Sequence, residues 1–584
     1  MKKTVSACLA VLAAAAVCAS PSRTPLEWAR LVADNVVDRV TPGFEYVMQA
    51  PYPDVEFIDF GISCAPVKGV AYGLTTMHSQ ADQEHTFAVG RTAGLKIWID
   101  DELVFEGRGA RELPIVFDER TYELPESFTV RLAAGDHRVL VKSEYTGDGK
   151  WLFLLQGPNM SRYAEKGQKI SCSLKNYAPK VTHANWLVLG TFEGDVDTPC
   201  PPEREDGFYR VYRSGGRQFG WNIPRINLLI DNRDGGKFFS WSYHVGGFVW
   251  ALQRLGAATG DPKYGDYAAR WCDYALETVP LAEYQTRELH AVRSMNFGQA
   301  DRPMLDYYSA PAMPYVTRLT ADPDFAEKEV YEARARKVVE YLKHRQFRID
   351  GIFARTYTRI PSIWVDDMFM GLPYLVYWAK YTDDPAEREA LLDDASTQVL
   401  TFNRYLFEPS AGLYRQACYP SRPEDKVPFW SRGNGWAFWA TSEVLEALPR
   451  NHKNYKAILS IYRKHAQGLV RCQDGDGFWR NVLDMEGSVR ESSGAAIFTM
   501  NLARGINNGW LSRKEYGPAV EKAWAALTTF VDENGDFNGV KAGTNFSTDP
   551  MDYERVKFVK SDTHGLLPFV FACLQMDRFC RERR

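Results

Sequence analysis

Two patterns of hydrophobic and polar positions divide the chain. From about Tyr52 to Leu189, short runs of alternating character are broken by Gly, Pro and Asp, which predicts the strands of a β-sandwich. Asp100 and Asp101 are expected to form the turn of a hairpin. The predicted strands include His85–Gly90, Leu95–Asp100, Glu102–Gly107, Ser127–Leu132 and His137–Tyr145.

From about Phe238 onward, apolar residues recur at helical spacing in segments joined by Gly, Asp and Pro loops. Many segments are apolar on more than one face, as expected of helices inside a layered all-α body. About ten to twelve helices in pairs predict an (α/α)6 toroid whose loops form a funnel at one end. The segment Pro25–Val40 is predicted as the toroid's first helix, with the sandwich inserted after it.

The predicted organisation is a multidomain α and β protein. At 584 residues the chain is too long for one ordinary core. The expected parts are a signal peptide at 1–19, a first toroid helix at 24–42, an accessory β-sandwich at 50–200 and an (α/α)6 catalytic domain at 210–584. The sandwich is expected to brace its neighbour rather than bind sugar, because no aromatic platform is evident in it.

The N-terminus has the features of a bacterial secretory signal peptide. Lys2 and Lys3 precede an apolar or small-residue run, and cleavage is expected near Ala19. This predicts a periplasmic or secreted protein. Lipoprotein anchoring through Cys18 is the less favoured alternative, because Val17 occupies a position where a small residue is preferred. No later apolar run reaches the roughly 18–20 residues that cross a bilayer.

Composition excludes some classes of partner and leaves others open. A formal net charge of -4 without any polybasic run argues against nucleic-acid binding. No Cys/His cluster has zinc spacing, and no phosphate or dinucleotide fingerprint appears, so neither a metal nor a cofactor is expected. The cysteines are predicted to be mostly free thiols with at most one bridge. The 16 Trp, 30 Tyr and 32 Phe residues suit either sugar stacking or a large core.

Two short stretches concentrate the candidate chemistry. Ile363–Leu375 reads IWVDDMFMGLPYL and places Asp366 and Asp367 among apolar residues. Burying such charges costs free energy unless they are paired or used, and a helix N-cap or buried ion pair is the structural alternative. Phe429–Trp436 reads FWSRGNGW and places Arg432 between tryptophans. Acid, cation and aromatic planes together can hold and protonate an anionic sugar.

These stretches belong to a longer series in fixed order. The series resembles glycoside hydrolase family 105, the unsaturated rhamnogalacturonyl hydrolases, and the related family 88 of unsaturated glucuronyl hydrolases. The resemblance covers roughly Trp241–Leu574 and leaves the sandwich outside. The phrases include WSYHVGG, MLDYYSAPAM, IWVDDMFMGLPYL, GLYRQACY, FWSRGNGWAFWA, DGDGFWRNVLD, ESSGAAIF and SDTHGLLP.

The resemblance implies an unusual reaction. Such enzymes remove the 4,5-unsaturated uronyl residue that polysaccharide lyases leave at a non-reducing end. A carboxylic acid protonates C4, water adds at C5, and the resulting hemiketal opens to release the aglycone. One proton donor with a raised pKa is then sufficient, whereas ordinary glycosidases need two carboxyl groups at the anomeric centre.

The resemblance also implies roles for individual residues. Asp366 matches the general acid/base, and Asp306 the second carboxylate, which would raise the pKa of Asp366. Asp367 is interpreted as structural, either a cap or an ion-pair partner. Substrate binding is implied for Arg432 and Trp436 beside the uronate, and for Trp364 and Tyr243 as further ring contacts. The alternative role for Asp306 is that of a helix N-cap. The alternative for Trp364 and Tyr243 is that they are core residues.

One position departs from the resemblance. The phrase GLYRQACY places Gln416 where the family usually has His. Gln can hydrogen-bond to a sugar or water but cannot titrate, so a slower or differently tuned enzyme is expected. His244 and His564 also lie in the motif regions and could line the funnel.

Two other functions stay open at this stage. An ordinary inverting glycosidase on the same toroid could use Asp306 and Asp366 as its carboxylate pair. Gln416, which cannot titrate, keeps a non-catalytic glycan-binding protein as the second alternative. The sequence does not distinguish galacturonate from glucuronate substrates, although the rhamnogalacturonan type is favoured, and it gives no oligomeric state.

Overall fold

The chain forms two compact units in the computed structural model. The helical unit comprises Met1–Phe44, Gly236–Glu277 and Asp301–Arg584, and the β unit comprises Glu45–Gly235 and Thr278–Ala300. The predicted signal peptide and Cys18 lie outside the described residues. These are 23–40, 44–49, 56–64, 67–114, 123–157, 169–193, 211–225, 229–291, 295–300, 304–322, 324–356 and 360–582.

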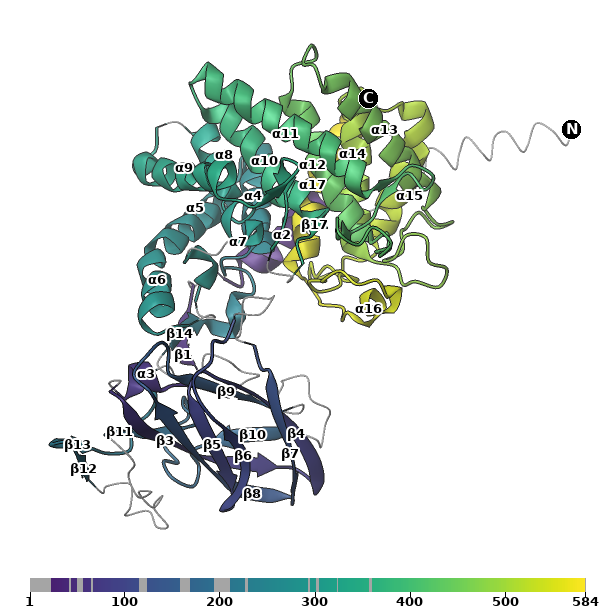
Figure 1. The fold of residues 1–584 in the computed structure, drawn as a ribbon. Coiled ribbons are helices and arrows are strands. Elements are labelled where there is room, and N and C mark those ends of the chain that lie inside the picture. The colour runs from purple at the N-terminus through teal and green to yellow at the C-terminus, as the bar shows by residue number, and fades with distance from the viewer. Residues whose placement is uncertain are drawn as a thin grey trace, which may run out of the picture. The chain divides into compact units, whose positions relative to one another are not determined.

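Six helices form the inner ring of the helical unit (Figure 1). Each packs against the next, and the last packs against the first, so the ring is closed. In chain order they are α4 (Tyr243–Thr259), α8 (Met313–Ala321), α10 (Asp366–Tyr381), α12 (Ser431–Ala447), α14 (Ser492–Asn507) and α17 (Thr563–Arg581).

Six outer helices surround this ring, and each packs mainly against one inner helix. Together the twelve described helices form an (α/α)6 toroid. The outer helices are α5 (Pro262–Glu277) on α4, α9 (Lys328–His344) on α8, α11 (Pro385–Leu406) on α10, α13 (Tyr455–Arg471) on α12, α15 (Arg513–Thr528) on α14 and α2 (Pro25–Val37) on α17.

The inner and outer positions follow from side-chain pattern. Every residue of inner helix α10 from Asp366 to Ala379 is buried, whereas outer helix α13 buries a single stripe that includes Ile458, Tyr462 and Leu469. A helix that is apolar on all sides belongs inside a helical body, and an amphipathic helix belongs at its surface.

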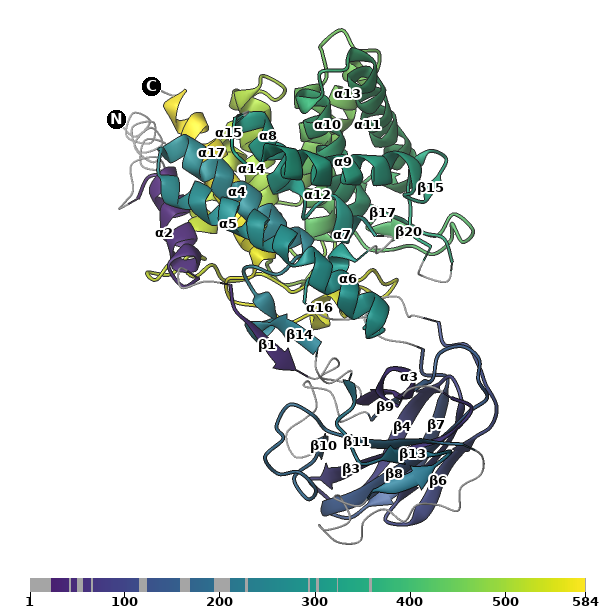
Figure 2. The ribbon, with the colours of Figure 1, turned by 90° about the vertical axis from the view of Figure 1, so that its left-hand side faces the viewer.

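Helix α2 belongs to the outer layer of the toroid, although the β unit separates it from α4 in the sequence. A capping box starts it: the Thr24 side chain accepts from the Glu27 backbone, and the Glu27 side chain accepts from the Thr24 backbone. The helix then packs against α17 and α4 (Figure 2). The helical unit is therefore discontinuous in the sequence.

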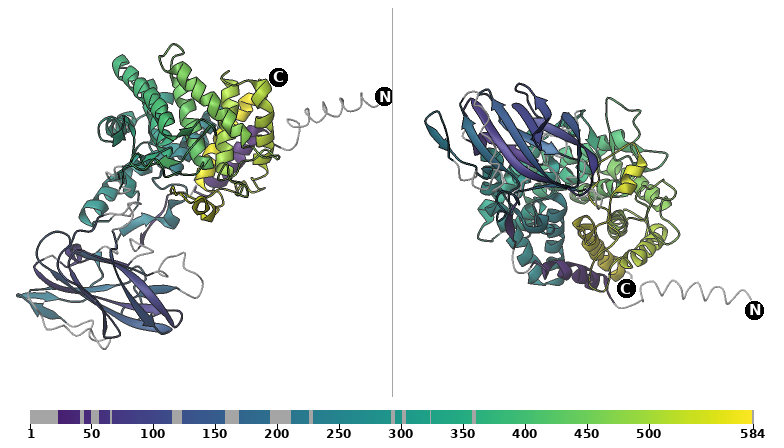
Figure 3. Two further views of the ribbon diagram at one scale, coloured as in Figure 1. Left: turned by 45° about the vertical axis from the view of Figure 1, so that its right-hand side comes forward. Right: turned by 90° about the horizontal axis from the view of Figure 1, so that it is seen from below.

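The β unit contains two larger sheets, whose strands are visible in Figure 3. One has the order β10-β3-β8-β5-β6 with β11 on β3, and the other has the order β2-β9-β4-β7. Side chains from both sheets share one buried cluster, including Ile97, Val141, Phe87 and Phe153. The strands are β2 (Glu56–Asp59), β3 (Gly69–Ser79), β4 (Gln83–Arg91), β5 (Gly94–Ile99), β6 (Glu102–Gly107), β7 (Glu126–Leu132), β8 (Gly135–Tyr145), β9 (Leu152–Gln156), β10 (Ile170–Ser173) and β11 (Leu187–Phe192).

The predicted combination of a helical body with an additional β-rich region is confirmed. The hairpin turn is also found, since Asp100 and Asp101 both have positive φ, at 47° and 72°. The β unit extends beyond the predicted sandwich and includes Thr278–Ala300. The sequence did not indicate this extension, because helix α6 (Val279–Glu288) continues the helical pattern of the segments around it. Its other elements are β1 (Tyr46–Gln49), α3 (Phe60–Ser63), β12 (Tyr212–Ser214), β13 (Arg217–Phe219) and β14 (Leu229–Asn232).

Short elements connect the long helices at the site described below. Strands β17 (Ile363–Trp364) and β20 (Ala417–Cys418) pair, with Trp364 opposite Ala417. The remaining elements here are α7 (Leu305–Tyr308), α16 (Pro550–Arg555), β15 (Arg348–Ile349), β16 (Ile352–Phe353), β18 (Phe407–Glu408) and β19 (Leu413–Tyr414).

Cys64, Cys172, Cys272, Cys418, Cys472 and Cys573 are free thiols, in line with the predicted mostly free cysteines. In the described part of the chain, no helix combines the length and the apolar character that spanning a membrane requires.

Candidate active site

The first turns of the inner helices carry three of the seven predicted site residues. Tyr243 is the first residue of α4, Asp366 the first of α10 and Arg432 the second of α12. Asp306 lies in α7, just before α8. The N-terminal end of a helix carries partial positive charge and unpaired N–H groups. A site built from several such ends suits an anionic ligand.

Asp366 is a buried carboxyl with spare hydrogen-bonding capacity. It is 8% exposed, and its Oδ2 atom has no hydrogen-bond partner among the described residues. Burial raises the pKa of Asp366 to about 7, with Arg355 opposing the rise and the charges of Asp367 and Asp306 adding to it. A carboxyl group with this pKa holds its proton close to neutral pH and can act as an acid.

Arg355 joins the two neighbouring carboxylates. Its Nε donates to both Asp367 oxygens at 3.0 Å, and its Nη2 donates to Oδ1 at 2.6 Å. The same Nη2 lies 3.2 Å from Asp306 Oδ2. Asp367 is therefore an ion-pair partner, as predicted, and one guanidinium fixes both Asp367 and Asp306.

Arg432 is fully buried and already bound within the protein. Its guanidinium lies 3.5 Å from Glu491 and above the Trp430 ring at 4.6 Å. Its Nη1 and Nη2 atoms donate to Ser493 Oγ at 2.9 Å, Lys541 O at 2.9 Å, Ala542 O at 2.6 Å and Thr544 Oγ1 at 3.5 Å. The Nη donors are thus occupied within the protein, and only Nε lacks a partner in the described part of the chain, so the carboxylate contact of Arg432 stays a prediction.

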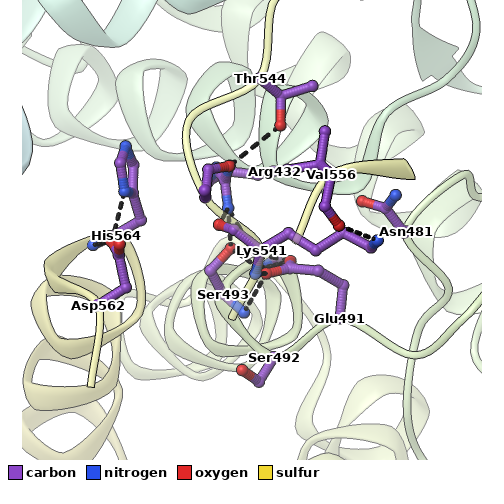
Figure 4. A network of polar contacts seen from close by, with 12 residues as sticks. Arg432, Asn481, Glu491, Ser492, Ser493, Lys541, Thr544, Val556, Asp562 and His564 are labelled. Atoms are coloured by element: carbon purple, nitrogen blue, oxygen red, sulfur yellow. Dashed lines mark hydrogen bonds and ion pairs between the residues drawn. The ribbon is translucent and has the colours of Figure 1, made fainter. Parts of the chain in front are cut away.

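The contacts of Arg432 are part of a wider polar network (Figure 4). Glu491 caps α14 by accepting from the backbone N–H groups of Ser493 and Gly494. Lys541 donates from Nζ to the carbonyl oxygens of Glu554 and Val556, at 2.9 and 2.7 Å. The network ties the segment between α15 and α16 to the starts of α12 and α14, which is a structural role.

The two predicted tryptophan contacts are also packed within the protein. Trp436 is 0% exposed and stacks on Phe369 at 4.5 Å between ring centres. Trp364 is 3% exposed, meets Phe546 edge-on at 4.8 Å and lies under the Arg355 guanidinium. The structure places both rings in the wall of the site instead of presenting them as open stacking platforms, because neighbouring aromatic rings and a cation cover them.

Gln416 supports the start of α10. Its backbone oxygen accepts from Val365 N at 2.8 Å, and its side-chain Oε1 accepts from the Tyr553 hydroxyl at 2.6 Å. Its Nε2 is buried and has no partner among the described residues. The Asp366 charge also acts on Tyr553, which is the hydrogen-bond partner of Gln416. In the part of the chain that the structure describes, Gln416 Nε2 is therefore a second unpartnered polar group near the acid.

Tyr243 ends a chain of hydrogen bonds from α17. His564 Nδ1 lies 2.5 Å from Asp562 Oδ1, and His564 Nε2 lies 2.5 Å from the Tyr243 hydroxyl. Burial raises the pKa of Tyr243, with Arg432 opposing and the charges of Asp306, Asp366 and Asp562 adding to the rise. The Tyr243 hydroxyl therefore lies within the electrostatic reach of both predicted catalytic carboxyls.

His244, Asp562 and His564 could in principle hold a metal ion, since their ligand atoms lie within 4.8 Å of one another. The two imidazole rings, however, stack 4.1 Å apart with an angle of 21° between their planes. Each ring nitrogen directs its lone pair within its own ring plane, so nearly parallel rings do not converge on one ion. The group fits a hydrogen-bonded chain better than a metal centre.

Several residues of this site carry no signal in the sequence. Arg355 lies in a loop without a recognisable motif, and Tyr553 comes from the short helix α16. Asp562 stands two residues before His564 in the phrase SDTHGLLP, but their contact with Tyr243 could not be expected, because Tyr243 is 321 residues from His564.

Residues 232–580 match a family model described as Glycosyl Hydrolase Family 88. The chain belongs to glycosyl hydrolase family 88. The matched span contains all of the inner helices except the final residue of α17. The predicted resemblance to families 105 and 88 is confirmed.

Curated relatives cover parts of the family 88 region. The unsaturated 3S-rhamnoglycuronyl hydrolases of Alteromonas sp. and Formosa agariphila are 35% and 32% identical over 183 residues, which is 30% of this chain and 43% and 48% of theirs. The chain thus spans less than half the length of these two relatives. Unsaturated rhamnogalacturonyl hydrolase YesR of Bacillus subtilis is 24% identical over 56% of this chain and 87% of its own length.

A solved family 105 glycoside hydrolase from C. acetobutylicum is 20% identical, with a TM-score of 0.48. The similarity covers 58% of this chain and 94% of that chain.

Proposed function

We propose that this family 88 protein is a hydrolase that removes a 4,5-unsaturated uronyl residue from the non-reducing end of oligosaccharides made by polysaccharide lyases. The observation that carries the proposal is the Asp366 carboxyl. It is buried, has a pKa of about 7, and keeps one oxygen unpartnered at the start of an inner helix.

The proposed reaction is hydration of the C4=C5 double bond. Asp366, as the neutral acid, gives its proton to C4 while water adds at C5, and the hemiketal that forms opens and releases the aglycone. Asp306 binds the sugar and helps to keep Asp366 protonated, because its charge raises the pKa of Asp366. The starts of the inner helices supply positive potential for the uronate carboxylate.

Oligosaccharides with an unsaturated uronyl residue linked to rhamnose are the first substrates to test. The names of three relatives, the unsaturated 3S-rhamnoglycuronyl and rhamnogalacturonyl hydrolases, support this choice. We further propose that the chain works after export, on the basis of Lys2, Lys3 and the apolar run that follows them.

The test is a screen of lyase digests from several polysaccharides, followed by the ultraviolet absorbance of the conjugated double bond. The proposed hydrolase removes this absorbance from unsaturated uronides and leaves the matching saturated uronides untouched. An ordinary inverting glycosidase would cleave saturated uronides, and a glycan-binding protein would change neither.

A further inference from the structure

A partly buried chain of three side chains leads to the site and has no part in the reaction proposed above. Asp562 contacts His564, and His564 contacts the Tyr243 hydroxyl, each at 2.5 Å. His564 is 4% exposed and stacks on His244, so its ring is fixed in one orientation. Asp562 is fixed as well, because it caps α17 through the His564 backbone N–H at 2.9 Å.

The direction of each hydrogen bond follows from the chemistry of the groups. Burial alone would raise the pKa of Asp562, but His564 and His244 hold it well below the usual aspartate range. An ionised carboxylate only accepts, so the proton of a neutral His564 is on Nδ1. Its Nε2 is then an acceptor, and the Tyr243 hydroxyl donates to it.

Tyr243 connects this chain to the acid. It is the first residue of α4, and the charges of Asp306 and Asp366 act on its hydroxyl. Because burial keeps that hydroxyl protonated, it can pass a proton to His564 only while it receives another at the same oxygen. This is the behaviour of a relay between a water molecule and a histidine.

We propose that Tyr243, His564 and Asp562 form the general base that activates the water attacking C5, while Asp366 acts as the acid. The assignment rests on the proposed function. Tyr243 is then a catalytic residue, and His564 and Asp562 are residues that act through it.

The step balances in atoms and electrons. The water oxygen bonds to C5 as one water O–H bond breaks, and the π electrons of C4=C5 take the Asp366 proton at C4. The water proton passes to Tyr243 Oη, and the original hydroxyl proton passes to His564 Nε2. The imidazolium formed is stabilised by the Asp562 carboxylate, and proton exchange with solvent afterwards restores neutral His564 and protonated Asp366.

A double-mutant cycle tests the relay in the full chain, with an unsaturated uronyl–rhamnose oligosaccharide as substrate. Tyr243→Phe and His564→Gln are each expected to lower kcat by about 10²–10⁴-fold with KM nearly unchanged, as for loss of a general base. The double variant should lose little more than either single variant, because groups that act as one unit are non-additive.

Asp562→Asn covers the case in which His564→Gln fails to fold. Asn caps helices as well as Asp does, so this variant keeps the start of α17 and removes only the charge that stabilises the imidazolium. We expect kcat to fall while the unfolding midpoint is unchanged. His452→Gln is the matched control, since His452 pairs with Asp393 at 2.9 Å in the connection between α12 and α13; its kcat should equal that of the parent.

The outcomes separate the two proposals. If the parent protein removes the absorbance but Tyr243→Phe or Asp562→Asn keeps kcat within about threefold, the relay is wrong and the hydrolase assignment stands. Losses that multiply in the double variant, or a stoichiometric divalent metal in the purified parent protein, would also overturn the relay. A parent protein that is inactive on every unsaturated uronide would overturn both.

Discussion

Asp366 and Arg432 occupy equivalent places, in the first turns of neighbouring inner helices. They differ in how far their polar atoms are engaged in hydrogen bonds within the protein. Both are buried, at 8% and 0% exposure. Asp366 keeps Oδ2 without a partner in the described part of the chain, whereas the Nη atoms of Arg432 donate to four groups. A buried carboxyl oxygen without a partner suits chemistry, whereas a guanidinium with most of its donors paired inside the protein suits a structural role.

The largest expected effect is on the acid. Asp366→Asn should lower kcat by about 10²–10⁴-fold, because the amide cannot deliver a proton. The free energy of unfolding should not fall, since the change removes a buried ionisable group without breaking an ion pair. Steady-state kinetics and chemical denaturation measure the two effects. Retained activity would place the acid elsewhere.

Arg432→Met should act on stability. Removing one partner of a buried pair leaves Glu491 uncompensated, which costs about 3–5 kcal/mol of unfolding free energy. The control is Arg404→Met, because the Arg404 side chain is 64% exposed in its pair with Asp350 and should shift stability by less than about 0.5 kcal/mol. If Arg432→Met instead kept full stability and raised KM alone, the carboxylate-binding role would be supported.

The pH profile tests the protonation state of the acid. The pKa of Asp366 is raised to about 7, so the protonated form dominates below that pH and is lost above it. We expect kcat/KM to fall about tenfold per pH unit above about pH 7. A basic limb that begins near the ordinary aspartate pKa would show that the buried environment does not hold the proton.

The smallest expected effect is at Gln416. Gln416→Met removes the closest acceptor of the Tyr553 hydroxyl, at 2.6 Å, and leaves that hydroxyl the longer contact to Ser547 O at 3.4 Å, so the loss should be about 0.5–1.5 kcal/mol of unfolding free energy. Tyr553→Phe removes the hydroxyl and should lose less. Denaturant titrations compare the two; equal stability of Gln416→Met and the parent protein would mean that water replaces the bond.

The sequence predicted residue types better than their tasks. Asp366 and the helical body were recognisable because motif and periodicity are local signals. The internal contacts of Arg432 were not, because its hydrogen-bond partners lie 61 to 112 positions further along the chain. The stacking of Trp436 on Phe369 was hidden for a related reason, because it is decided by packing between helices. Arg355 and the Tyr243–His564 contact likewise depend on tertiary structure.

Hydrolysis in heavy water, followed by nuclear magnetic resonance at early times, tests the central claim most directly. If Asp366 protonates carbon, the released uronyl product should carry one solvent deuterium at C4, added to one face, and Asp366→Asn should abolish both deuterium uptake and aglycone release. Release of the aglycone with the double bond still present, or without deuterium at C4, would contradict the account.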